Sequence, residues 1–169
     1  MERYILSVLV NNHSGVLSRI AGLFSRRGYN IDSLSVGETE NPEISRMTIA
    51  VSGDASVLEQ ITKQLDKQVD VRHVQVLGNG EGVFRELVMV KIDAPQEVRA
   101  VVVELADIFR AKIVDVDTRS VSVEITGESD KINAFFRLVE PYGIKEIVRT
   151  GLTAIGRGNS TIHDIMNKK

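Results

Sequence analysis

The feature that most constrains this chain is one order of strand-like and helix-like segments, which occurs twice along it. In each half a short run of β-branched and aliphatic residues leads into a helical pattern, two further strand patterns, a second helical pattern and a last strand. The order β-α-β-β-α-β, with both helices on one face of four strands, is the ferredoxin-like arrangement. The sequence therefore predicts an α+β fold of two tandem ferredoxin-like βαββαβ domains.

The first half also contains residues that begin or end helices. Gly28 is suited to end the first helix and Asp54 to cap the second. Between Val71 and Val74 the alternation of the last strand slips, which indicates a β-bulge. The expected strands lie at residues 4–10, 30–36, 46–51 and 69–76, and the expected helices at residues 16–27 and 55–65.

The second half repeats this order with little residue identity to the first. Its strands are expected at residues 87–92, 112–116, 121–125 and 144–149, and its helices carry apolar faces at residues 98–109 and 132–139. The glycine-rich residues 78–82 resemble a phosphate-binding loop, but a strand pattern follows them instead of a helix. We therefore expect domains at residues 1–77 and 83–150, a linker at residues 78–82, and a C-terminal tail at residues 151–169 that packs locally or is ordered by a partner.

Domains of about 70–80 residues bury a limited share of their surface and are marginally stable alone. Exposed sheet edges also need to be covered. Both facts favour self-association, so we expect at least a dimer.

The composition excludes several classes of protein. The chain has 169 residues, a net charge of −2 and no cysteine, so no overall field favours nucleic acid and disulfides are excluded. The apolar runs are too short to span a bilayer and the N-terminus lacks a signal-peptide pattern. We expect a cytoplasmic protein with neither a membrane nor a nucleic-acid partner.

The chain also lacks the groupings that catalysis and metal binding require. His13, His73 and His163 are scattered, and none is spaced from a second ligand as metal sites require. Asp115 and Asp117 share a strand face, but acidic residues at a hairpin are more often turn residues than cation ligands. Aromatic residues make up only 5% of the chain, so the sheets offer no base-stacking platform for RNA. We predict neither catalytic residues nor a metal site.

The turn at residues 11–15 is the one segment whose chemistry suggests a ligand. It joins the first strand to the first helix, so its backbone includes N–H donors that the helix leaves unpaired, and these favour a carboxylate. Gly15 lets a ligand approach the backbone closely, Asn12 offers an amide beside it, and Ser14 can cap the helix. An ordinary strand-to-helix turn remains the alternative interpretation.

Five longer segments resemble one family. Residues 3–19 (RYILSVLVNNHSGVLSR) resemble the opening of an ACT domain, and specifically that of the small regulatory subunit of acetolactate synthase, also called acetohydroxyacid synthase. The similarity continues through residues 22–31, 45–49, 85–92 and 108–116, and it extends from residue 2 to about residue 158.

The resemblance implies a non-catalytic regulatory subunit. Its partner would be the large catalytic subunit, which holds thiamine diphosphate, magnesium and FAD, whereas this chain would hold no cofactor. The small subunit raises the activity of that partner in branched-chain amino-acid synthesis and confers feedback inhibition, usually by valine. ACT domains pair as homodimers, with the branched-chain amino acid at their interface.

Carried over by position, the resemblance predicts an effector site built from two protomers. Asn30 and Ile31 would come from the paired protomer, and they rest on the resemblance alone. The residues of the predicted site are Asn12, Ser14, Gly15, Val16, Leu17, Asn30 and Ile31.

One other class of function stays open beside this one. A free-standing ACT-type regulator could act on transcription or on a different enzyme, although the sequence has no helix-turn-helix pattern and no basic patch.

Overall fold

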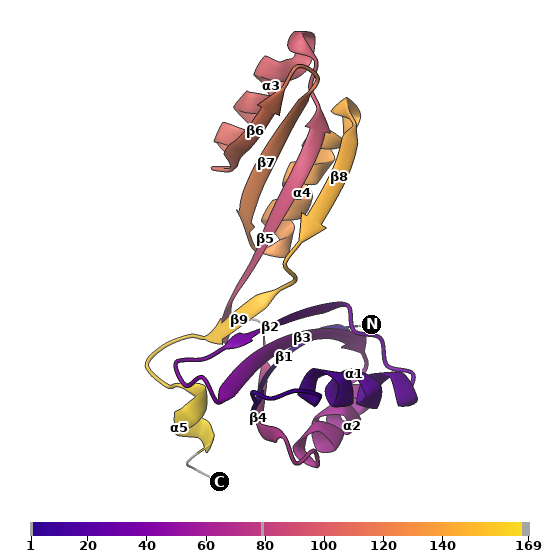
Figure 1. Cartoon of the computed structure of the whole chain (residues 1–169), viewed down its shortest axis with the longest axis vertical. Coiled ribbons are helices and arrows are strands. Elements are labelled where there is room, and N and C mark those ends of the chain that lie inside the picture. The colour runs from indigo at the N-terminus through magenta and orange to yellow at the C-terminus, as the bar shows by residue number, and fades with distance from the viewer. Residues whose placement is uncertain (1, 79, 167–169) are drawn as a thin grey trace. The chain divides into compact units, whose positions relative to one another are not determined.

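The computed structural model describes residues 2–78 and 80–166. Asn79 of the predicted linker and residues 167–169 of the predicted tail lie outside the described residues. The chain forms two compact units (Figure 1). The first runs to Val83 and is joined again by the chain from Leu152 onward, and the second comprises Phe84–Gly151.

The first unit is an antiparallel sheet with two helices on one face, as Figure 1 shows. The order of the strands across the sheet is β2-β3-β1-β4, so β2 and β4 form its edges. This arrangement confirms the predicted βαββαβ order. The elements are β1 (Glu2–Asn11), α1 (Val16–Arg26), β2 (Ser33–Glu38), β3 (Ile44–Gly53), α2 (Ala55–Asp66) and β4 (Val71–Leu77).

Local sequence signals in this unit act as expected. After α1 the chain turns left-handed at Gly28, and the N–H groups of Gly28 and Tyr29 donate to carbonyls of the last helical turn. The Asp54 carboxylate caps α2 by accepting from the Val57 N–H at 2.9 Å. Opposite Leu9 and Val10 of β1 the pairing jumps from His73 to Val71, which confirms the predicted bulge in β4.

Both faces of the first sheet are buried. One face packs on α1 and α2 through a core that includes Leu6, Val8 and Ile49. On the other face Ser7 and Leu9 are also buried, and here the returning chain forms β9 (Thr153–Gly156) and α5 (Ile162–Met166). Figure 1 shows β9 on the side of this sheet that faces away from its helices.

The returning chain is attached to the first unit by specific contacts. The Leu152 N–H donates to Ser33 Oγ at 2.7 Å, and Ser35 Oγ donates to the Leu152 carbonyl at 2.9 Å. The side chains of Leu152, Ala154 and Ile162 are buried. The sequence left open where this segment packs, and the structure places the described part of it in the first unit.

The second unit has the same order of elements. Its strand order is β6-β7-β5-β8, and its core contains Val90, Ile125 and Phe135. The strand β5 begins at Gly82, five residues before the expected start at residue 87, because the strand continues directly from the glycine-rich segment. The elements are β5 (Gly82–Asp93), α3 (Gln96–Ile108), β6 (Lys112–Asp117), β7 (Ser120–Gly127), α4 (Ser129–Val139), a 3-10 helix η1 (Glu140–Tyr142) and β8 (Ile144–Arg149). None of the helices within residues 2–78 and 80–166 is long and apolar enough to cross a membrane.

Candidate functional site

The turn between β1 and α1 is built around Gly15. This residue occupies the N-cap position of α1 with a φ of 86°, a conformation that suits glycine. The prediction that Ser14 caps the helix is wrong, because Gly15 occupies the position from which a side chain would cap, and no side-chain hydrogen bond caps α1.

The absence of a capping side chain leaves backbone donors at the start of α1. Among the described residues, no acceptor bonds the N–H groups of Ser14, Gly15 or Leu17, and the Val16 N–H reaches the His13 carbonyl only at 3.5 Å. The first turn of α1 also carries no acidic residue. These donors lie at the positive end of the helix dipole, so an external carboxylate would be stabilised here.

Only the Nδ2 end of the Asn12 side-chain amide forms hydrogen bonds to other described residues. Its amide Nδ2 donates to the Pro42 carbonyl at 2.8 Å and to Glu38 Oε1 at 3.1 Å. Its backbone N–H donates to the Glu43 carbonyl at 2.7 Å, which ties the turn to the β2–β3 hairpin. The amide Oδ1 has no partner among the described residues and remains free to accept from an ammonium group.

A buried carboxylate, Asp70, holds the turn in place. Arg19 pairs with it through Nε at 2.8 Å and Nη2 at 2.5 Å, and His13 Nε2 lies 3.0 Å from its Oδ1. The Asp70 carbonyl accepts from the Asn11 N–H at 2.9 Å. Burial raises the pKa of the Asp70 carboxyl, but the hydrogen bonds from Arg19 and Asn11 and the charges of Arg19 and His13 outweigh it, so the pKa lies below its ordinary 3.8.

Sequence reasoning missed Asp70 and Arg19 as parts of this site. The two residues are 51 positions apart, and no periodicity or motif connects them. His13 was interpreted as a surface residue, and its side chain is indeed about half exposed. Only the contact between Arg19 and Asp70 in the folded chain identifies these residues as parts of the site.

Asn30 and Ile31 lie in the loop before β2. The strand expected at residues 30–36 begins at Ser33 instead. Asn30 Nδ2 donates to Asp32 Oδ1 at 2.8 Å, a local bond that favours a turn over strand pairing. Ile31 is partly buried against the helix-side core.

The two groups of predicted site residues lie at opposite ends of the sheet within one chain. The Asn12 N–H donates to the carbonyl of Glu43, just before β3 begins, whereas the Asp32 N–H, beside Asn30 and Ile31, donates to the Ala50 carbonyl near the other end of β3. From residue 43 to residue 50 a strand rises about 23 Å, at about 3.3 Å per residue. The structure therefore brings together Asn12, Ser14, Gly15, Val16 and Leu17, but not Asn30 and Ile31 of the same chain.

The arrangement suits binding of a small zwitterion, since donors for a carboxylate lie beside an acceptor for an ammonium. No group of three or more His, Cys, Asp or Glu side chains within residues 2–78 and 80–166 could hold a metal ion. A βαββαβ sheet with such a turn after its first strand defines the class of ACT-type regulatory domains.

Comparison with known families agrees with this class and narrows it. Residues 6–73 match the family described as "AHAS small subunit-like ACT domain", and residues 85–158 match the family described as "Small subunit of acetolactate synthase". The chain belongs to the family of acetolactate synthase small regulatory subunits, as the sequence predicted.

Individual relatives span nearly the whole chain. A "Probable acetolactate synthase small subunit" of Methanothermobacter thermautotrophicus is 51% identical over 95% of this chain and 96% of the relative. The "Acetolactate synthase small subunit" of Mycolicibacterium smegmatis is 48% identical over 92% of this chain and 91% of its own length. The crystal structure of the acetolactate synthase small subunit from Thermotoga maritima superposes with a TM-score of 0.86 at 39% identity, covering 95% of this chain and 100% of the other.

Proposed function

We propose that this chain stimulates the large catalytic subunit of acetolactate synthase and confers feedback inhibition by valine or another branched-chain amino acid. Its family supports a large-subunit partner. Thiamine diphosphate, magnesium and FAD belong to that partner in this proposal. The observation that carries the regulatory role is the uncapped start of α1, where backbone donors lie beside the free Oδ1 of Asn12.

The effector binds across this turn. Its carboxylate accepts from the N–H groups of residues 14–17, and its ammonium donates to Asn12 Oδ1. Two exposed apolar side chains are available to its aliphatic group, since Leu17 of α1 is 48% and Val36 in the middle of β2 is 45% exposed. Burying a valine-sized group contributes about 1.5–3 kcal/mol.

A second copy of the chain completes the site. The strand β2 is an edge of its sheet, so an antiparallel copy of β2 can extend that sheet about a two-fold axis. Reversal of the strand direction brings the beginning of one β2 opposite the end of the other. Asn30 of the partner subunit and Ile31 of the partner subunit then lie beside Asn12, which the ~23 Å separation within one chain does not allow.

Inhibition follows from this shared geometry. An amino acid that contacts both protomers favours one arrangement of the pair, and the large subunit is most active with the other. The expected coupling free energy is about 1–3 kcal/mol.

The direct test is reconstitution. The purified chain is mixed with the large subunit, and acetolactate formation is measured with and without valine. We expect stimulation by the chain and loss of that stimulation at increasing valine. Unchanged activity on addition of the chain, or an activity insensitive to valine, leucine and isoleucine, contradicts the proposal.

The dimer is tested separately by light scattering. Val36→Asp places a charge on the exposed part of β2 and should give the mass of one chain at micromolar concentration. Val69→Asp changes a side chain of the same unit that is 92% exposed, and it should leave the mass at that of a dimer. Equal masses for the two variants would show that the β2 edge is not the interface.

A further inference from the structure

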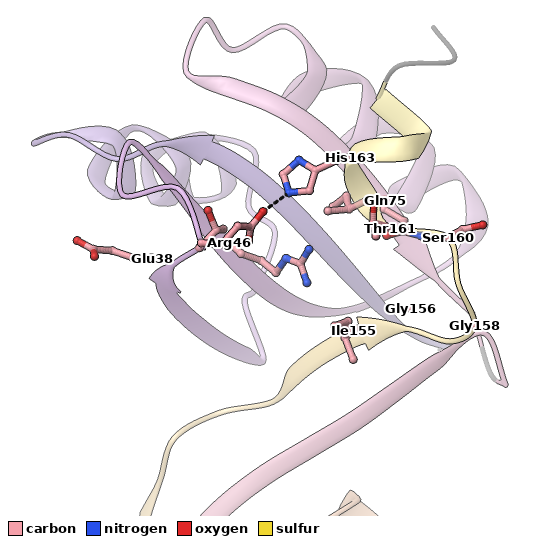
Figure 2. Close-up of a pocket in the computed structure, with 12 residues that line it drawn as sticks. Glu38, Arg46, Gln75, Ile155, Gly156, Gly158, Ser160, Thr161 and His163 are labelled. Atoms are coloured by element: carbon pink, nitrogen blue, oxygen red, sulfur yellow. Dashed lines mark ion pairs between the residues drawn. The ribbon is translucent and has the colours of Figure 1, made fainter.

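A cavity lies in the first unit, away from the turn at Gly15. It measures 410 Å³, within the range of about 300–1,000 Å³ that is common for small-molecule sites. Arg46 of β3 and Gln75 of β4 line it on the side of the sheet, and Ile155 of β9, Gly158 and residues 160–163 line it on the side of the returning chain (Figure 2). The returning chain therefore encloses a space over the sheet face that is opposite the helices.

The most informative group in this cavity is the guanidinium of Arg46. Figure 2 shows it directed into the cavity. Its Nε is buried and has no hydrogen-bond partner, and no carboxylate among the described residues forms an ion pair with it. Buried donors are nearly always satisfied in folded proteins, and a charged donor even more so, because its desolvation is costly. No acceptor among the described residues that line the cavity reaches this Nε.

Two glutamates line the cavity beside Arg46, and neither of them forms an ion pair with its guanidinium. Glu38 turns its carboxylate away from the cavity in Figure 2, and Asn12 Nδ2 binds it at 3.1 Å. Glu40 Oε1 lies 2.7 Å from His163 Nε2. The pKa of Glu40 is lowered by a hydrogen bond from its own backbone N–H, then by His163 and by the charge of Arg46, so the Glu40 carboxylate is ionised and bonded to His163. Arg46 is therefore a cation that points into the cavity and whose buried Nε has no hydrogen-bond partner.

The rest of the lining accommodates a small organic molecule. Ile155 and Ile162 provide apolar surface, and Ser160 and Gln75 provide neutral polar groups. A guanidinium binds a carboxylate in a bidentate fork more specifically than it binds other acceptors. We propose that this cavity binds a small aliphatic carboxylate, whose carboxyl group accepts from Arg46 while its hydrocarbon body lies against Ile155.

This site is distinct from the effector site proposed above and does not depend on it. The two are joined at one point, since Glu38 lines the cavity and accepts from Asn12 of the turn. The carboxylate can be that of a simple acid or that of an amino acid. Three probes separate these sources: isovalerate carries the carboxylate alone, L-valine carries both charges, and isobutylamine carries the ammonium alone.

The test is titration of the full ¹⁵N-labelled chain with each probe by NMR. We expect isovalerate or L-valine to shift the amide signals of Gly156 and Gly158 saturably, and isobutylamine to leave them unchanged. Binding of isovalerate assigns the site to simple acids, and binding of L-valine alone assigns it to amino acids. Absence of saturable shifts at Gly156 and Gly158 with both carboxylates, or equal shifts with the amine, overturns the proposal.

Three variants identify the residue responsible. Arg46→Gln should weaken binding at least tenfold, and Arg46→Lys should weaken it less because the charge remains. Arg27→Gln, which removes an exposed arginine of the same unit, should leave the affinity unchanged. If Arg46→Gln does not fold, as the spectrum itself reports, the Arg46→Lys titration decides, and wild-type affinity in that variant counts against a guanidinium-specific site.

The same spectra keep this proposal separate from the effector site. Gly15→Asp should abolish valine-dependent shifts at residues 14–17 and preserve those of the bound carboxylate at Gly156 and Gly158. Shifts confined to residues 14–17 would overturn the second site and leave the proposed function intact. Shifts confined to Gly156 and Gly158 would contradict the effector site at the turn and leave the cavity site intact.

Discussion

Gly15→Asp tests the effector site most directly, because it places a carboxylate where the carboxylate of the effector binds. A Cβ at Gly15 would lie 3.3 Å from Arg19 Nη1, so this nitrogen, which does not bond Asp70, must shift by only a few tenths of an ångström. The φ of 86° is strained for most side chains at a cost of about 1–2 kcal/mol, but aspartate tolerates it better than most. The variant should therefore fold and keep its turn.

The expected loss of effector binding can be estimated from the donors at the start of α1. Hydrogen bonds to a charged group contribute about 1.5–3 kcal/mol each, so the loss of two costs at least about 3 kcal/mol. At about 1.4 kcal/mol per factor of ten, this raises the valine concentration for half-inhibition by more than about a hundredfold. Repulsion between the two carboxylates adds to this effect.

The assay is acetolactate formation by the large subunit with each variant over a range of valine concentrations. Gly28→Asp is the matched control, since Gly28 also has a positive φ of 70° and a Cβ there would meet nothing within 4 Å. Gly28→Asp should keep both stimulation and valine sensitivity, whereas Gly15→Asp should keep stimulation only. Half-inhibition within threefold of the wild type in Gly15→Asp would refute the placement of the effector carboxylate.

Three further predictions concern stability. Ser14→Ala should change the unfolding free energy by less than about 0.5 kcal/mol, because the Ser14 hydroxyl does not cap α1, and a larger loss in urea unfolding would restore it as a cap. The lowered pKa of Asp70 stabilises the folded state above its ordinary value of 3.8, and this stabilisation disappears as the pH falls through the folded-state pKa. Thermal unfolding should therefore show a steeper loss of stability below about pH 4 in the wild type than in Asp70→Asn, and parallel profiles would contradict this. Phe135→Ala should cost about 3–5 kcal/mol in the second unit, because Phe135 is fully buried against Phe109, and Leu138→Ala on the exposed side of α4 serves as its control in the same urea titration.

The features that could be predicted are those that neighbouring residues encode. Hydrophobic periodicity gave the βαββαβ order of both units, because one face of each helix or strand must be apolar to be buried, but it did not predict η1, β9 or α5. Gly28 and Asp54 were assigned correctly because a helix end depends on one residue and on the backbone groups next to it. The prediction that Ser14 caps α1 was wrong, because the sequence does not show that Gly15 adopts the left-handed conformation and takes the N-cap position.

For the candidate site too, the sequence determined the local features and the tertiary structure determined the contacts between distant residues. Sequence alone pointed to residues 12–17 and to a carboxylate, since a strand-to-helix turn ending in glycine exposes backbone donors whatever surrounds it. Only the tertiary structure showed that Asp70 anchors this turn through Arg19 and that Asn30 lies at the far end of the sheet. It also showed that the returning chain covers the second sheet face and leaves Arg46 in a cavity. Ion pairs and cavities join residues tens of positions apart, and their energies depend on distance and burial, which periodicity does not encode.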